Sequence, residues 1–312
     1  MKVAKITKVK TIKDENNNDD YTIYIDTDSI FVSSVPLLDH RIPNWKDNTQ
    51  DTIAGFVNDI AEEVQDYLNE FYDMLAVKVF NIDKDKHRFE IKKEYVSKSG
   101  IWIAKKRYAQ WIISDNGVPV DKLDVKGLDV VRSSYPAAFR KFMSEILIEI
   151  LRGDTEDLIT NRVYDFKNNL PKMDVVNVAK AGAVKNLSKY LPKKKDQTAM
   201  FQFASGTPAH VKASIAYNQL LTHYGVQNKF APLKDGDKIK WVYLQQNPFG
   251  LDAVAMNGYD DPPEIMEFIQ TYINHDKIFE RELLKKLEDF YGALSWGEVL
   301  SSTKSAEKFF SF

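Results

Sequence analysis

The chain has 312 residues with 44% hydrophobic and 12% aromatic residues and a net charge of -2. This composition excludes a disordered chain and leaves room for two globular domains. The absence of cysteine excludes disulfides and zinc–thiolate sites and favours a reducing, cytoplasmic location. No run of 18 apolar residues occurs, so we expect no membrane partner.

The first third of the chain predicts strands around one long helix. Residues 1–20 are polar and form an N-terminal extension. Residues 21–34, YTIYIDTDSIFVSS, predict a hairpin with Asp26–Ser29 at its turn. Apolar residues at helical spacing predict a helix over residues 51–76, capped by Asp51 or Thr52. Residues 88–96 and 101–113 predict two further strands joined by a turn at residues 98–100.

The rest of the chain predicts mainly helices. A helix over residues 132–153 is capped by Ser133 or Ser134 and ends at Gly153. Helical patterns recur over residues 154–169, 208–224 and 264–291, with a strand in DKIKWVYLQQNPFG. Strands followed by helices favour an α+β fold with a boundary near Lys126.

Two carboxylates stand at the predicted hairpin turn, at Asp26 and Asp28. At 4 Å two such charges repel by roughly 4 kcal/mol in a surface-like dielectric. Mg²⁺ reverses that repulsion, and two such ions can support phosphoryl transfer. A D-x-D pair is also common in ordinary acidic turns, so the pair alone leaves both interpretations open.

A second candidate cluster is basic: Lys105, Lys106 and Arg107, followed by Tyr108. Residues 78–107 hold ten Lys or Arg against four Asp or Glu. On one strand, Lys105 and Arg107 would share one face, and Lys106 and Tyr108 the other. Such a strand suits a sugar–phosphate surface, although lysines also protect sheet edges. A third basic stretch, residues 183–195, has five lysines and fits phosphates or a solvated loop equally well.

Taken in this order, YIDTDSIF and KKRYA resemble the family B DNA polymerases. DTDS resembles their second palm aspartate motif, and KKRYA resembles their lysine-rich palm motif, which holds the primer–template. VKGLDVVRSSYP resembles the start of the thumb. PAHVKASIAYNQLL, NPFG and the aromatic C-terminus resemble the thumb of polymerases from T-even-type bacteriophages.

The resemblance implies a partial palm, an antiparallel sheet with a helix over residues 21–126, then a mostly helical thumb over residues 127–301. It implies two Mg²⁺ ions near Asp26 and Asp28, with Glu90 matching a further acidic position, and primer–template DNA and dNTP as substrates. The implied DNA-binding residues are Lys105, Lys106, Arg107, Tyr108, Lys126, Arg132, His210 and Lys212.

Several family elements are not found in these 312 residues. They are the exonuclease domain, the D-x-x-S-L-Y-P palm motif and the K-x-x-x-N-S-x-Y-G finger helix. DVVRSSYP differs from the palm motif in spacing and order. We therefore expect the C-terminal subunit of a split polymerase, active in the cytoplasm (of the host, if viral) only with an N-terminal partner chain. The alternative is a catalytically inactive, thumb-like module that binds duplex DNA.

The tail, residues 302–312, ends in the aromatic residues Phe309, Phe310 and Phe312. Apolar side chains on a free terminus need a partner, and paired aromatics suit the pocket of a sliding clamp. The alternative is a tail that packs on its own thumb.

Overall fold

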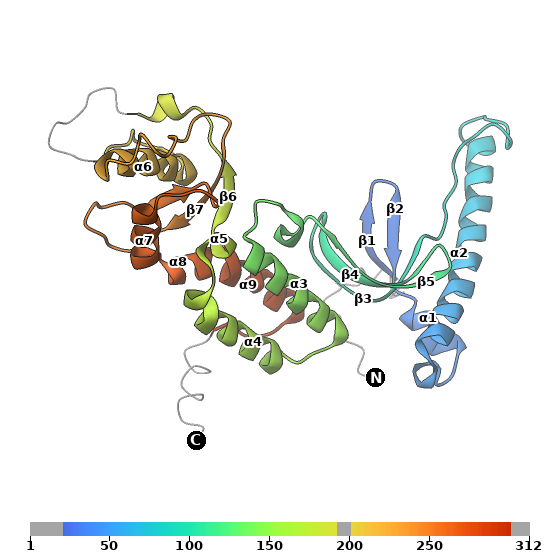
Figure 1. The fold of residues 1–312 in the computed structure, drawn as a ribbon. Helices are drawn as coiled ribbons and strands as arrows, with labels where there is room; N and C mark the ends of the chain where they lie inside the picture. The colour runs from blue at the N-terminus through green and yellow to red at the C-terminus, as the bar shows by residue number, and fades with distance from the viewer. Residues whose placement is uncertain (1–20, 192–200, 301–312) are drawn as a thin grey trace, which may run out of the picture. The chain divides into compact units, whose positions relative to one another are not determined.

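The computed structural model describes residues 21–191 and 201–300 (Figure 1). They divide into two compact units. The first takes in the described residues up to Leu128, with Leu147–Asp154 and Ala293–Ser295. The second takes in Asp129–Ile146, Thr155–Gly292 and the described residues from Trp296 on. Antiparallel sheets and helices in these units confirm the predicted α+β class.

The first unit contains a two-stranded hairpin, a long helix and a three-stranded meander (Figure 1). Its elements are β1 (Thr22–Asp26), β2 (Ser29–Val32), α1 (Val35–Arg41), a 3-10 turn (Trp45–Asp47), α2 (Gln50–Lys78), β3 (Tyr95–Ala104), β4 (Arg107–Asp115) and β5 (Val118–Lys126). In the hairpin, Asp26 pairs with Ser29, so the predicted turn is confirmed.

Helix α2 begins one residue earlier and ends two residues later than its apolar periodicity predicts. Its cap is Thr49, whose hydroxyl accepts a hydrogen bond from the Thr52 amide at 3.3 Å. The predicted cap at Asp51 or Thr52 is therefore wrong. Thr49 has an extended backbone just before the first helical residue, which is the geometry that a capping hydroxyl requires.

The predicted turn at residues 98–100 is wrong, because these residues lie inside β3. Gly100 pairs with Gln110 across the ladder. A Cβ atom at Gly100 would lie 2.5 Å from the Trp102 ring, so this glycine makes room for an indole and does not bend the chain. The turn lies instead at Lys105–Lys106, and the predicted strand at residues 88–94 is not part of a ladder.

The second unit is helical around a small antiparallel sheet, β6–β7–β8. Its elements are a 3-10 turn (Asp129–Val131), α3 (Ala137–Arg152, whose last residues belong to the first unit), α4 (Glu156–Asn169), a 3-10 turn (Leu170–Lys172), α5 (Val175–Val178), β6 (Lys180–Ala183), a 3-10 turn (Leu187–Tyr190), α6 (Ala209–His223), β7 (Lys238–Tyr243), β8 (Ala253–Met256), α7 (Pro263–Tyr272), α8 (His275–Phe279), a short π-helix (Glu280–Leu284) and α9 (Lys285–Leu294, whose last two residues belong to the first unit).

The predicted helices over residues 154–169 and 208–224 are confirmed as α4 and α6. Helix α3 begins at Ala137, so Ser133 and Ser134 lie too far upstream to cap it. The predicted helix over residues 264–291 is interrupted, because Ile273 forms a β-bridge with Leu244. Strands β6 and β8 were not expected from the sequence. Within the described residues, no helix is long and apolar enough to cross a membrane.

Candidate functional site

The two aspartates lie on either side of a tight hairpin turn. Thr27 adopts a left-handed backbone with φ of 44°, which lets β1 reverse into β2 within two residues. Asp28 is exposed, whereas 27% of the Asp26 side chain is accessible. The Thr27 hydroxyl donates to Asp26 Oδ1 at 3.4 Å, so the turn holds one carboxylate in place.

The β3–β4 turn at Lys105–Lys106, called the lysine turn, contacts the hairpin turn at Asp26–Ser29, called the aspartate turn. Lys106 Nζ lies 3.4 Å from Asp26 Oδ1, and the Lys106 amide donates to the Tyr24 hydroxyl at 2.9 Å. Lys106 has a left-handed backbone with φ of 59°, and Lys105 is exposed beside it. The predicted alternation of Lys105, Lys106 and Arg107 along one strand is therefore wrong, because the first two residues form the β3–β4 turn.

A cluster of aromatic rings joins the two turns. The Tyr108 ring centroid lies 5.8 Å from that of Tyr24, 5.4 Å from that of Phe31 and 6.0 Å from that of Trp102. Such tilted and stacked pairs stabilise the packing by about 0.5–1.5 kcal/mol each. Burial raises the pKa of Tyr108, and the carboxylate of Asp124 raises it further, so its phenol remains protonated at neutral pH.

Gly127 fixes the lysine turn from the other side. It has φ of 66°, and a Cβ atom there would lie 1.9 Å from the Lys106 carbonyl oxygen. Only glycine allows two backbone segments to come this close. Sequence reasoning missed this residue, because a single sequence does not show which backbone segment will approach a glycine.

Glu90 is placed away from this turn. It is exposed, and Lys92 Nζ lies 3.2 Å from its carboxylate. The neighbouring Ile91 hydrogen-bonds with Asn69 of α2. In the described part of the chain, no three His, Asp or Glu side chains gather to hold a metal ion. The structure therefore does not join Glu90 to Asp26 and Asp28, and its role as a ligand stays a prediction.

Asp26 and Asp28 nevertheless fit a partial magnesium site. Both offer hard oxygen ligands from one tight turn, and Asp28 is open to solvent. Mg²⁺ keeps several waters and is bound by one or two carboxylates together with substrate phosphates. Two carboxylates are thus a sufficient protein contribution only if other ligands complete the coordination.

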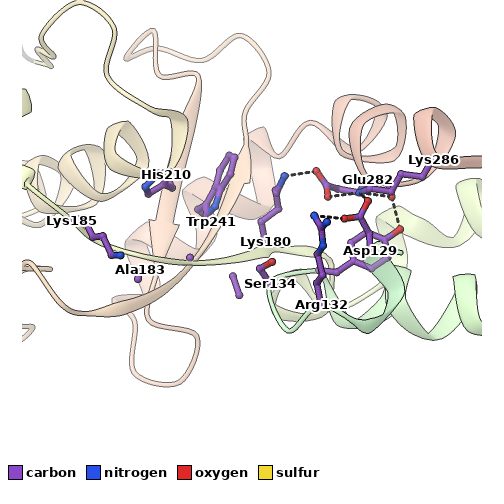
Figure 2. Close-up of a pocket in the computed structure, with 13 residues that line it drawn as sticks. Asp129, Arg132, Ser134, Lys180, Ala183, Lys185, His210, Trp241, Glu282 and Lys286 are labelled. Atoms are coloured by element: carbon purple, nitrogen blue, oxygen red, sulfur yellow. Dashed lines mark hydrogen bonds and ion pairs between the residues drawn. The ribbon is translucent and has the colours of Figure 1, made fainter. Parts of the chain in front are cut away.

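A basic pocket of about 550 Å³ lies in the second unit (Figure 2). Arg132 and His210, two of the predicted DNA-binding residues, line it together with Lys180, Lys185 and Trp241. Lys185 is exposed at this site. Burial lowers the pKa of His210, so its imidazole is neutral at pH 7 and cannot add a positive charge.

One side of this pocket is a buried ion cluster around Glu282. Only 3% of the Glu282 side chain is accessible, and its carboxylate contacts Lys180 at 2.7 Å and Lys286 at 3.2 Å (Figure 2). Asp129 pairs with Arg132 at 2.9 Å and lies 3.8 Å from Lys286. A buried carboxylate requires such partners because desolvation is costly. The sequence did not point to this cluster, because Lys180 lies about a hundred residues before Glu282 and Lys286.

Of the remaining predicted residues, Lys126 lies opposite Tyr108 across the β4–β5 ladder, whereas Lys212 lies in the second unit. Lys126 pairs with Asp124 at 3.2 Å at the end of β5. Lys212, on α6, lies 3.7 Å from Asp252. The predicted clamp-binding residues Phe309, Phe310 and Phe312 lie outside the described residues. The same is true of Lys193, Lys194 and Lys195 in the third basic stretch.

Comparison with known proteins agrees with the motifs. The sequence model of DNA polymerase family B matches residues 2–291. The chain is 24% identical over 284 residues to a DNA-directed DNA polymerase of Enterobacteria phage T4, covering 87% of this chain. It is 23% identical over 288 residues to the DNA-directed DNA polymerase of Escherichia phage RB69, covering 88% of this chain. The chain spans 30% of the length of each relative. By its sequence and its motifs, this chain belongs to DNA polymerase family B and corresponds to a C-terminal part of such an enzyme.

Proposed function

We propose that this chain is the C-terminal, palm-and-thumb part of a DNA-directed DNA polymerase. It would act in template-directed addition of dNMP to a primer 3′-OH. The observation that supports this proposal is the 3.4 Å contact between Asp26 and Lys106, which joins the DTDS turn to the KKRYA turn across 80 residues of sequence. A carboxylate pair beside cationic side chains suits a reaction in which phosphates and a primer end meet.

Each side chain has a separate task in this proposal. Asp26 and Asp28 would hold divalent metal, which when bound would neutralise developing charge on the transferred phosphoryl group. Lys105 and Arg107 would bind backbone phosphates near the primer end, and the aromatic cluster around Tyr108 would keep that surface rigid. Lys106 would hold Asp26 in position through its ion pair.

We propose that a second chain carries the family elements not found in these residues. We expect the 312-residue chain alone to show no nucleotide incorporation on a primed template. Adding a polypeptide from the same source with the D-x-x-S-L-Y-P and K-x-x-x-N-S-x-Y-G elements should restore it. Primer extension with the two proteins, separately and mixed, tests this. Efficient synthesis by the chain alone would contradict the two-chain arrangement.

We further propose that the pocket of the second unit binds duplex phosphates. For binding to duplex DNA, log K falls linearly with log salt concentration. Lys185→Gln should make this slope less steep by about 0.9, because one phosphate contact is lost. His210→Gln should leave that slope unchanged at pH 7.5, because the lowered pKa keeps this ring neutral. Fluorescence anisotropy of labelled duplex at several salt concentrations measures both. Equal slopes for Lys185→Gln and wild type would remove this pocket from the DNA-binding surface.

The alternative function is a DNA-binding module without catalysis. The basic pocket would serve such a module equally well, whereas clustered acids at the hairpin turn would repel phosphates. Substitution of Asp28 by alanine separates the two functions, because only the polymerase needs this carboxylate.

A further inference from the structure

Helix α2 carries one apolar face along its whole length, and only the first half of that face is covered. Apolar residues recur there at spacings of three and four, which places them on one side of the helix. In the first half, this face packs on a small core formed by Leu38 and Trp45. The residues of α2 that take part are Ile53, Phe56, Val57 and Ile60.

The second half of the same face is open to solvent. Tyr67 is 70% exposed, Phe71 and Met74 are each 42% exposed, and Val64 is 41% exposed. We call these four residues the α2 stripe. A continuous row of large apolar side chains on one helix is an interaction site more often than a solvated surface.

The neighbouring face of α2 is covered by this chain itself. Asn69 exchanges hydrogen bonds with the backbone of Ile91 at 2.8 and 3.0 Å, and Gln65 accepts one from the Lys93 amide at 2.9 Å. The segment that follows α2 thus returns along the helix and packs beside its polar side chains. The α2 stripe lies on a different side, about a third of a turn away or more by helical geometry.

A second apolar surface of the same unit is also open. In the hairpin, Tyr24 and Phe31 point into the aromatic cluster, so Ile25, Ile30 and Val32 point the other way. Ile25 is 61% exposed, Ile30 is 41% exposed and Val32 is 46% exposed. A two-stranded hairpin is only marginally stable without further packing. The first unit therefore lacks a covering layer at two places.

We propose that the α2 stripe is the docking face for the N-terminal part of the polymerase. This proposal rests on the proposed function. The chain spans only 30% of the length of each phage relative, and an open apolar face of the first unit is a suitable surface on which the rest of such a polymerase could pack. The acidic residues Asp59, Asp66 and Glu70 follow the helix beside the stripe, whereas Glu63 is already paired with Arg41 at 2.6 Å. The occupant should accordingly present apolar anchors flanked by Lys or Arg.

The experiment measures binding and not catalysis. The intact 312-residue chain is titrated with the purified N-terminal polypeptide of the reconstitution experiment, in an ultracentrifuge or a calorimeter. The double substitution Tyr67→Ala and Phe71→Ala should raise the Kd at least about 100-fold, because both side chains are central apolar anchors. The matched control is Tyr259→Ala, an 89% exposed tyrosine of the second unit, which should leave the Kd unchanged. Circular dichroism checks that both variants are folded.

Three results would overturn the docking proposal: no binding by the wild-type chain, equal binding by the double variant, or self-association through the α2 stripe that the N-terminal polypeptide does not displace. Failure of the proposed function is a separate result. In that case a complex would form and the double variant would weaken it, but the complex would incorporate no nucleotide.

Discussion

Asp28→Ala is expected to lower nucleotide incorporation by the reconstituted polymerase about 1,000-fold, which corresponds to about 4 kcal/mol of lost transition-state stabilisation. Asp28 is exposed on the hairpin turn, so its removal should change the free energy of unfolding by less than about 0.5 kcal/mol. Affinity for duplex DNA should not fall, because a negative charge is removed. Single-turnover extension of a labelled primer and anisotropy with the same duplex measure these two effects.

Asp85→Ala is the control for this experiment, since Asp85 is also an exposed aspartate of the first unit. It should leave both incorporation and DNA affinity unchanged. Full incorporation by a folded Asp28→Ala variant would make the aspartate pair structural. The chain would then be better described as a duplex-binding module.

Gly127→Ala is expected to displace the lysine turn and weaken primer–template binding at least about tenfold, by analogy with losses caused by small misplacements in active sites. The added methyl would lie 1.9 Å from the Lys106 carbonyl, and one of the two backbones must move. Because Asp26 is paired with Lys106, the movement also reaches the aspartate turn. Anisotropy with primed DNA measures the affinity, and chemical denaturation measures the stability.

Gly117→Ala is the matched control, because Gly117 has φ of 83° but no atom within 4 Å of an added Cβ. Both alanine variants should lose about 1–2 kcal/mol of stability from the left-handed backbone alone. Only Gly127→Ala should lose DNA affinity beyond that. Equal affinity for the two variants would mean that the contact between Gly127 and Lys106 does not position the site.

The sequence predicted those elements whose pattern is local. The hairpin at Asp26–Ser29 and helix α2 follow from alternating and helical periodicity, and the structure confirms both. The lysine turn was misplaced because Gly100 resembles a turn residue, whereas it makes room for Trp102. Strands β6 and β8 are short, and the four residues of β8 are all buried, so they carry no alternation to detect.

The same distinction, between features that the sequence predicts and features that depend on long-range contacts, holds for the candidate site. The contact between Asp26 and Lys106 joins two motifs that family resemblance had already paired. The cluster of Lys180, Glu282 and Lys286 could not be predicted, because strand pairing and a short π-helix bring distant residues together there. Gly127 acts through the space it leaves free, and a single sequence gives no sign of which backbone will approach it.

Thr27 and Lys106 both hold a left-handed backbone at the tips of their turns. Neither is glycine, and such a conformation costs roughly 1–2 kcal/mol for residues with a Cβ atom. Glycine at either position would relieve that cost, yet glycine at position 106 would also remove the ammonium group that contacts Asp26. Selection for heat resistance alone would thus favour losing Lys106. This turn is a point where stability and activity place opposite demands on one residue.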